Sequence, residues 1–211
     1  RTFTFNIAIN DLDEFDVTTP TDTDATQNNV DENVAVGTTV GITANAFDLD
    51  STTNTITYLN LQKSAGIRIF QLFDSWGGIL RKEDYEQYLL PHVQRIFNEV
   101  DLPSIYYLKN CAHLIEAMDL CRSDFLSVCE TVDLGTNSIL KKSKKGIQGN
   151  LFQGLLYADD KTLEKEVRKI LKDSKQFKKY IFNLSHGIQP DVPVEKVKLV
   201  VELVHSVKRS L

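Results

Sequence analysis

Five short apolar runs, separated by segments of helical pattern, limit the fold of this chain more than any other feature. The runs cover residues 69–73, 104–108, 125–129, 146–149 and 180–184. One separating segment places Leu163, Val167, Ile170 and Leu171 on a single helical face, behind Asp159 or Asp160 as a cap. Alternation of strands and helices predicts a parallel sheet and therefore an α/β fold.

The first run ends in a polar turn. Residues 69–73 are apolar, as in a strand that is buried on both faces, and Asp74 and Ser75 then lead into Gly77 and Gly78. Parallel barrels keep their chemistry just after the carboxyl ends of the strands. This rule selects a set of candidate site positions: Asp74, Ser75, residues 109–113, Thr131, residues 148–150 and residues 183–186.

Two more patterns predict helices. Tyr85, Tyr88, Leu89, Val93, Ile96 and Phe97 share one face, with Pro91 restarting the helix, and a last stripe behind Pro193 contains Val194, Val197, Val201, Val204 and Val207. Five strand–helix units are too few for an eight-stranded (β/α) barrel. We therefore predict a partial TIM barrel of about five units. Its two open strand edges favour aggregation or assembly with a second copy, such as a homodimer.

The charge changes sharply along the chain. Residues 1–60 hold ten acids and one base, a net charge of −9, whereas the remainder holds 19 acids and 23 bases, a net charge of +4. Such a step predicts two unlike parts, which we divide at residues 1–57 and 58–211. Neither a membrane-spanning run nor a basic patch typical of nucleic-acid binding is present, so no membrane or nucleic-acid partner is expected.

The cysteines favour a reduced, cytoplasmic setting for the second part. All three, Cys111, Cys121 and Cys129, lie there, and an odd number cannot pair completely within one chain. Because the sequence begins with Arg1, we expect it to be a piece of a longer protein.

Three segments of the second part resemble the uroporphyrinogen decarboxylase family. They are YLNLQKSAG at residues 58–66, FDSWGG at residues 73–78 and NLSHGIQPD at residues 183–191, in the family's order. The resemblance implies that residues 58–211 are strands four to eight of the decarboxylase barrel. It also implies cytoplasmic decarboxylation of the four acetate groups of uroporphyrinogen III, giving coproporphyrinogen III in haem biosynthesis, without metal or organic cofactor.

The same resemblance assigns roles to three residues. His186 is the implied catalytic residue, and Ser75 and Asp74 are the implied substrate-binding residues. Taken without the resemblance, Ser75 would be read as a turn cap and His186 as a hydrogen-bonded turn residue. The family's RQAGR segment, whose arginines bind substrate carboxylates, and its upstream aspartate have no counterpart here. Residues 127–131 and 150–153 also depart from the family pattern. We therefore expect the isolated chain to be inactive.

The first part resembles a cadherin-type repeat of bacterial adhesins. The match rests on ENVAVGTTV at residues 32–40 and AFDLD at residues 46–50, and it predicts an incomplete β-sandwich-like segment. Ca²⁺ prefers six to eight oxygen ligands, so the resemblance implies Glu32, Asp48 and Asp50 as calcium ligands, with Asp11 and Asp13 in the preceding linker. A solvated acidic loop is the plainer interpretation.

Two rival interpretations remain open from the sequence. If the first part dominates, the protein is an extracellular, calcium-dependent adhesion module, and the whole chain is a chimera of two parents. A related branch of the barrel family transfers methyl groups with zinc, for which Cys111 and His113 offer a thiolate and an imidazole. That branch has the order His-x-Cys and a second Cys where His186 stands, so the zinc hypothesis is the weaker one.

Overall fold

The computed structural model describes residues 21–22, 44–45 and 51–207. The chain divides into two compact units, Arg1–Tyr58 and Leu59–Leu211. In the first unit, β1 (Thr21–Asp22) pairs antiparallel with β2 (Ala44–Asn45). The predicted calcium ligands Asp11, Asp13, Glu32, Asp48 and Asp50 all lie outside the described residues.

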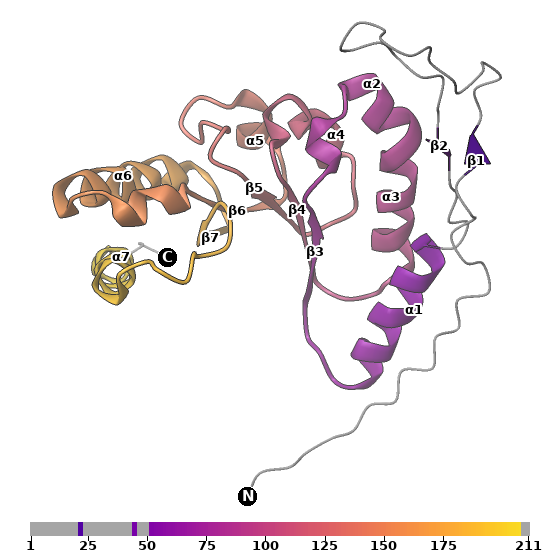
Figure 1. Ribbon diagram of the computed structural model, residues 1–211, viewed down its shortest axis with the longest axis horizontal. Coiled ribbons are helices and arrows are strands. Elements are labelled where there is room, and N and C mark those ends of the chain that lie inside the picture. Colours follow the sequence, from indigo (N-terminus) through magenta and orange to yellow (C-terminus); the bar gives the residue numbers. More distant parts are fainter. Residues whose placement is uncertain (1–20, 23–43, 46–50, 208–211) are drawn as a thin grey trace, which may run out of the picture. The chain divides into compact units, whose positions relative to one another are not determined.

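A five-stranded parallel sheet forms the second unit (Figure 1). Its strands are β3 (Phe70–Asp74), β4 (Ser104–Leu108), β5 (Phe125–Val128), β6 (Gly146–Leu151) and β7 (Tyr180–Leu184), and they lie side by side in that order. Each neighbouring pair is parallel. This confirms the predicted α/β partial barrel. Within the described part of the chain, β3 and β7 each pair with a strand on one side only.

Helices connect the strands, as the alternating pattern predicts. The longer ones are α1 (Ser51–Ser64), α3 (Leu90–Glu99), α6 (Asp160–Asp173) and α7 (Val194–Ser206), and the shorter ones are α2 (Lys82–Asp84), α4 (Ile115–Asp119) and α5 (Ser138–Lys142). Helix α3 lies beside the β3 end of the sheet, and α6 packs on α7 at the β7 end (Figure 1). None of the described helices has the length and hydropathy needed to cross a membrane.

Single turns complete the connections. One π turn, η2, spans Tyr85–Leu89. The 3-10 turns are η1 (Gly77–Ile79), η3 (Cys111–His113), η4 (Gln153–Tyr157) and η5 (Ser174–Gln176).

The burial of β3 differs from the prediction. All side chains of β4 and β6 are buried, as expected for central strands of a parallel sheet. In β3, however, Phe70 is buried whereas Phe73 is 67 % exposed. Phe70 stacks on Phe97 of α3, with ring centroids 5.7 Å apart. The helices therefore cover one face of this edge strand, and the opposite face, which carries Phe73, stays open.

A π turn changes which residues of the segment 85–97 are buried. Tyr85, Val93, Ile96 and Phe97 are buried as predicted, but Tyr88 is 63 % exposed. The π turn Tyr85–Leu89 precedes α3, where Pro91 occupies the first turn. Since a π turn holds more residues than an α turn, it rotates Tyr88 outward and brings Leu90 into the core.

Helix α6 agrees with its sequence pattern. The side chain of Asp159 accepts a hydrogen bond from the Thr162 backbone N–H at 3.0 Å, which makes Asp159 the N-cap. All four residues of the predicted stripe, Leu163, Val167, Ile170 and Leu171, are buried.

Helix α7 is rotated from its predicted orientation. The pattern placed Val194 and Val201 on the buried stripe, yet both are exposed, and Val200 and Leu203 are the buried residues. This helix carries valine or leucine on more than one side. Hydrophobic periodicity alone therefore does not determine which side packs on α6.

Two neighbouring valines test this orientation. Val200→Ala removes two buried methyl groups and should lower the free energy of unfolding by about 1–2 kcal/mol. The matched change Val201→Ala alters a side chain that is 47 % exposed, and should change it by less than about 0.5 kcal/mol. Urea denaturation of both variants measures the difference. A larger loss at position 201 than at position 200 would contradict the orientation of α7.

Candidate active site

Ser75 and His186 line the same pocket. This pocket has a volume of about 440 Å³, and its walls are formed by Gln71, Phe73, Ser75, Tyr107, Ser127, Asn183, Leu184, Ser185, His186 and Gly187. Ser75 follows β3 and His186 follows β7, the two outer strands of the sheet. Because all five strands run in the same direction, their carboxyl ends meet at one rim, and this rim holds both side chains.

Strand register explains the walls of the pocket. Phe73 pairs with Tyr107, Tyr107 with Ser127, and Ser127 with Gln148, so one side chain from each of the strands β3 to β6 forms a row on the uncovered face. The buried Gln148 amide donates hydrogen bonds to Ser127 Oγ at 2.9 Å and to Gln71 Oε1 at 3.1 Å. The base of the pocket is therefore a connected set of neutral polar groups.

Asp74 shapes the turn that presents Ser75 but does not line the pocket. Its Oδ1 accepts hydrogen bonds from the backbone N–H groups of Trp76 at 3.1 Å and Gly77 at 2.6 Å. Side chains alternate along a strand, so Asp74 points to the face opposite Phe73 and Ser75. Asp74 therefore stabilises this turn, and its contact with substrate stays a prediction.

Two buried tyrosines connect Asp74 to the core through hydrogen bonds. Tyr106 donates its hydroxyl proton to Asp74 Oδ2 at 3.3 Å, and the Tyr106 and Tyr85 hydroxyls are 2.8 Å apart. Both tyrosines are fully buried. The conformation of the Ser75 turn therefore depends on packing between β4 and the helical segment that begins at Tyr85.

The two glycines of the turn are required by close approach. A side chain at Gly77 would meet Asp74 Oδ2, and one at Gly78 would meet the carbonyl oxygen of Lys109 after β4. Both glycines are buried. The turn after β3 therefore packs directly against the carboxyl end of β4.

His186 is exposed, and the residue before it is fixed. The Ser185 backbone N–H donates to the Leu151 carbonyl at 2.8 Å, and the Ser185 hydroxyl donates to Gln153 Oε1 at 3.0 Å. Tyr107 donates its hydroxyl proton to the Ser185 carbonyl at 2.8 Å. These bonds fix the backbone beside His186, whose ring stays accessible from the pocket.

Tyr107 was not singled out by the sequence analysis. Burial raises the pKa of Tyr107 to about 12, so its hydroxyl keeps its proton near neutral pH and remains a donor to Ser185. Its ring also lies against Phe73, with centroids 5.6 Å apart. The one available signal was its position in the predicted strand 104–108, on the same side as the pocket.

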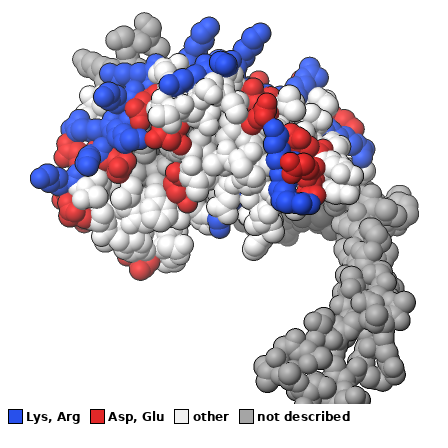
Figure 2. All heavy atoms as spheres, turned by 90° about the horizontal axis from the view of Figure 1, so that it is seen from above, with Lys and Arg blue, Asp and Glu red and all other residues white. Residues whose placement is uncertain are grey.

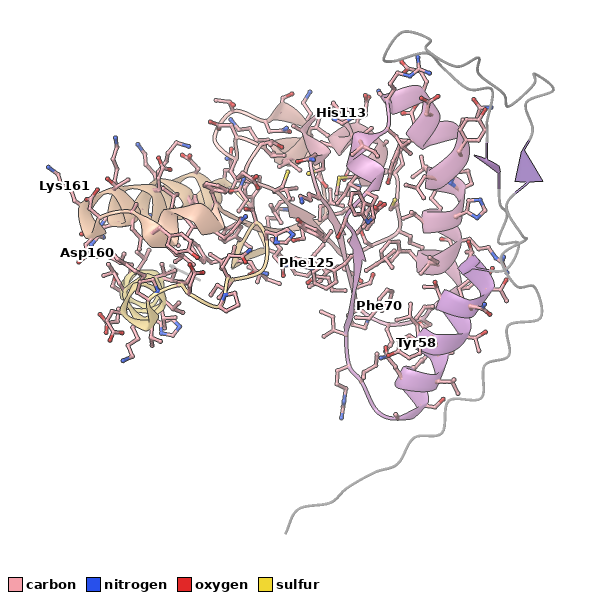
Figure 3. All side chains as sticks on the ribbon, in the orientation of Figure 1. Tyr58, Phe70, His113, Phe125, Asp160 and Lys161 are labelled. Atoms are coloured by element: carbon pink, nitrogen blue, oxygen red, sulfur yellow. The ribbon has the colours of Figure 1, made fainter. Side chains whose placement is uncertain are left out.

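The residues proposed for zinc do not converge. Cys111 is buried with its Sγ 3.7 Å from Cys129 Sγ. The His113 ring, labelled in Figure 3, is exposed and bonds through Nε2 to the Leu80 carbonyl at 2.8 Å. The hydrogen bond between the two thiols lowers the pKa of Cys129 and raises that of Cys111. Among the described residues, no group of three or more potential metal ligands lies together.

Charged side chains of both signs lie on the face that Figure 2 shows. Lys and Arg are interspersed there with Asp and Glu, and an area without charged side chains lies between them. The side chains that line the Ser75–His186 pocket include no Lys, Arg, Asp or Glu. The lining therefore combines polar and apolar side chains without a carboxylate, ammonium or guanidinium group.

Comparisons with known proteins identify the family of the chain. The sequence model of a family described as "Uroporphyrinogen decarboxylase (URO-D)" matches residues 49–207. The chain belongs to the uroporphyrinogen decarboxylase family. That match begins before residue 58 and includes Asp50, which the cadherin-like interpretation assigned to calcium. Neither this family nor the relatives named below supports a cadherin-like repeat.

Two uroporphyrinogen decarboxylases illustrate the relationship. The enzyme of Citrifermentans bemidjiense is 38% identical over 163 residues, and that of Aquifex aeolicus is 37% identical over 163 residues. Each match covers 75% of this chain and 48% of the relative. The chain therefore spans about half the length of these relatives.

A solved structure shares the fold. A methyltransferase from Methanosarcina mazei superposes with a TM-score of 0.66 at 20% sequence identity, covering 74% of this chain and 47% of that protein. At this identity the likeness concerns the fold alone.

The tyrosine pair behind the Ser75 turn can be tested directly. Tyr106→Phe leaves the buried Tyr85 hydroxyl and Asp74 Oδ2 without this hydrogen-bond partner, and should lower the free energy of unfolding by about 1–2 kcal/mol. Tyr88→Phe, at a position that is 63 % exposed, should lower it by less than about 0.5 kcal/mol. Urea denaturation gives both values. Equal losses in the two variants would show that the buried contact does not stabilise the turn.

Proposed function

We propose that residues 58–211 form one wall of a porphyrinogen decarboxylation site. Membership of the uroporphyrinogen decarboxylase family supports this reaction class. The observation that carries the proposal is the shared pocket of Ser75 and His186, two residues that reach it from opposite edges of the sheet. In this proposal Ser75 contacts the substrate, and His186 is the catalytic acid.

The chemistry requires an acid next to an electron-rich ring. Protonation of a pyrrole carbon makes the ring an electron acceptor. The bond between the acetate methylene and its carboxylate then breaks, carbon dioxide leaves, and the bond's electron pair enters the ring. A second protonation at the methylene gives a methyl group, and loss of the first proton restores the pyrrole. Each acetate thus takes up one proton overall, without metal or organic cofactor.

His186 suits the role of acid by its position. Its imidazole is exposed at the pocket, so it can exchange protons with solvent between steps. Ser75 has one hydroxyl proton to donate to a substrate oxygen. Asp74, in this proposal, acts through the turn and holds Ser75 in place without touching the substrate.

The pocket provides only part of what the substrate requires. A porphyrinogen with many carboxylates needs cationic partners, and arginine binds carboxylates best because its fork matches their geometry. The described lining of this pocket contains no arginine or lysine. We therefore propose that the 211-residue chain by itself binds porphyrinogen weakly and does not turn it over.

Binding tests the assigned residues. Ser75→Ala and His186→Ala should each weaken binding of uroporphyrinogen III about three- to tenfold, as expected for the loss of one hydrogen bond. His113→Ala alters an exposed histidine outside the pocket and serves as the matched control. Anaerobic equilibrium dialysis gives the three dissociation constants. Wild-type affinity in both pocket variants would contradict the assignment.

Turnover tests the inactivity of the isolated chain. Purified chain incubated anaerobically with uroporphyrinogen III should form no coproporphyrinogen III, because the described lining of the pocket offers no cationic side chain to the substrate carboxylates. Chromatography of the oxidised porphyrins measures the product. Sustained turnover that Ser75→Ala and His186→Ala abolish would establish the chemistry but contradict the need for a further wall.

A further inference from the structure

Two buried cysteines meet beyond the carboxyl ends of β4 and β5. Cys111 follows β4, Cys129 follows β5, and their Sγ atoms are 3.7 Å apart. Cys111 is 0 % exposed and Cys129 is 1 % exposed. Cys121 is buried as well, but among the described residues its thiol bonds to neither of the other two. The structure therefore contains one close pair of thiols and one separate thiol.

The turn after β4 brings Cys111 to this position. Asn110 has a φ of 55°, in the left-handed region that asparagine tolerates better than most residues. The chain turns there and enters η3 at Cys111. Leu108 pairs with Val128, so the residues after the two strands lie at the same rim of the sheet. Cys111 and Cys129 are thus 18 residues apart in the sequence but adjacent in the fold.

The surroundings of Cys129 favour its thiolate form. The Cys111 thiol and the Thr131 hydroxyl, whose oxygen is 2.9 Å from Cys129 Sγ, can both donate a hydrogen bond to this sulfur. These two bonds lower the pKa of Cys129, whereas the same bond and burial raise the pKa of Cys111. The thiolate is the form of cysteine that attacks electrophiles, so Cys129 is suited to act as nucleophile and Cys111 as the second thiol.

A small molecule can approach Cys129 from one side. Exposed Thr131 and buried Asn150 line a cavity of about 410 Å³. Thr131 bonds to Cys129 Sγ, and the Asn150 amide donates to the Cys129 carbonyl at 3.0 Å. Two residues of the cavity wall therefore contact Cys129 directly, and one layer of side chains separates the cavity from the sulfur.

We propose that Cys111 and Cys129 form a redox-active dithiol that a hydroperoxide oxidises to a disulfide. The Cys129 thiolate attacks one peroxide oxygen, the O–O bond breaks, and hydroxide leaves with a solvent proton as water when the oxidant is hydrogen peroxide. Cys111 then attacks the sulfur of the resulting sulfenic acid. The S–O bond breaks, the S–S bond forms, and the Cys111 proton leaves with the hydroxide as a second water. The dithiol thus loses two electrons and two protons, which reduce the peroxide.

Bond formation requires a small movement. A disulfide holds its sulfurs about 2.0 Å apart, so the two side chains must approach by roughly 1.7 Å from their present separation of 3.7 Å. The new bond ties η3 to the end of β5. In a reducing compartment it is reversible, because thiol exchange returns it to the dithiol. This inference goes beyond the proposed function and needs neither Ser75 nor His186.

Peptide mapping tests which cysteines become linked. The folded 211-residue chain is treated with hydrogen peroxide, the remaining thiols are alkylated, and the peptides are compared by mass spectrometry before and after reduction. Trypsin and a glutamyl endopeptidase together place each cysteine in a separate peptide, because they cut after Lys109, Glu116, Arg122 and Glu130. The expected product joins Cys111 to Cys129 with the loss of two hydrogen atoms, and dithiothreitol restores both thiols.

Cys121 provides the internal control. It is buried, and burial raises its pKa to about 12, so it should react at least about tenfold more slowly than Cys129. If the thiols reacted only after unfolding of the chain, Cys121 would be oxidised at a similar rate. The variant Cys121→Ser should therefore form the disulfide as fast as the wild-type chain.

Two serine variants test the order of the steps. In Cys111→Ser, the sulfenic acid at Cys129 meets no second thiol, so dimedone should trap it there. In Cys129→Ser, neither a disulfide nor a dimedone adduct should form at Cys111. Circular dichroism shows whether each variant is folded, and if one is not, the peptide map of the wild-type chain decides.

Three results would overturn the proposal. They are unchanged thiols in the folded wild-type chain after peroxide treatment, a disulfide that includes Cys121, and a dimedone adduct at Cys111 in folded Cys129→Ser.

Discussion

A parallel sheet needs cover on both faces, and this requirement governs the structure. Helices bury one face of the sheet, where Phe70 stacks on Phe97 of α3 and Leu163 of α6 is buried. The opposite face carries the polar set of Gln71, Ser127 and Gln148 and the Ser75–His186 pocket. The exposed Phe73 and the open pocket both lie on that uncovered face.

The covered face also controls the site. The side chains of Tyr85 and Tyr106 pack on the helix-covered side of the sheet, and their hydroxyls connect to Asp74. Asp74 in turn holds the turn that contains Ser75. On the β7 side, Tyr107 and Gln153 hold Ser185 and so fix the backbone next to His186. The two implied functional residues are therefore positioned by buried contacts, although both side chains are exposed.

The sequence predicted what depends on local pattern. Residues 104–108 and 180–184 form strands with these bounds, because apolar runs between turn residues have few alternatives. The burial predicted for Tyr88 and for the α7 stripe was wrong. A simple helical period does not account for a π turn, nor for a helix that is apolar on several sides. Strand alternation could have shown that Asp74 and Ser75 face opposite sides. The hydrogen bond from Tyr107 to Ser185 joins segments that are far apart in the sequence, so no local sequence pattern predicts it.

The central claim is that Ser75 and His186 act in one porphyrinogen pocket, and nuclear magnetic resonance tests it most directly. Amide spectra of the labelled chain are recorded during anaerobic titration with uroporphyrinogen III. The account predicts shifts that saturate together at residues 71–75 and 183–187. Residues 131–134, beside a separate cavity of about 410 Å³, should remain unchanged. Shifts confined to residues 131–134, or independent saturation at Ser75 and His186, would contradict the account.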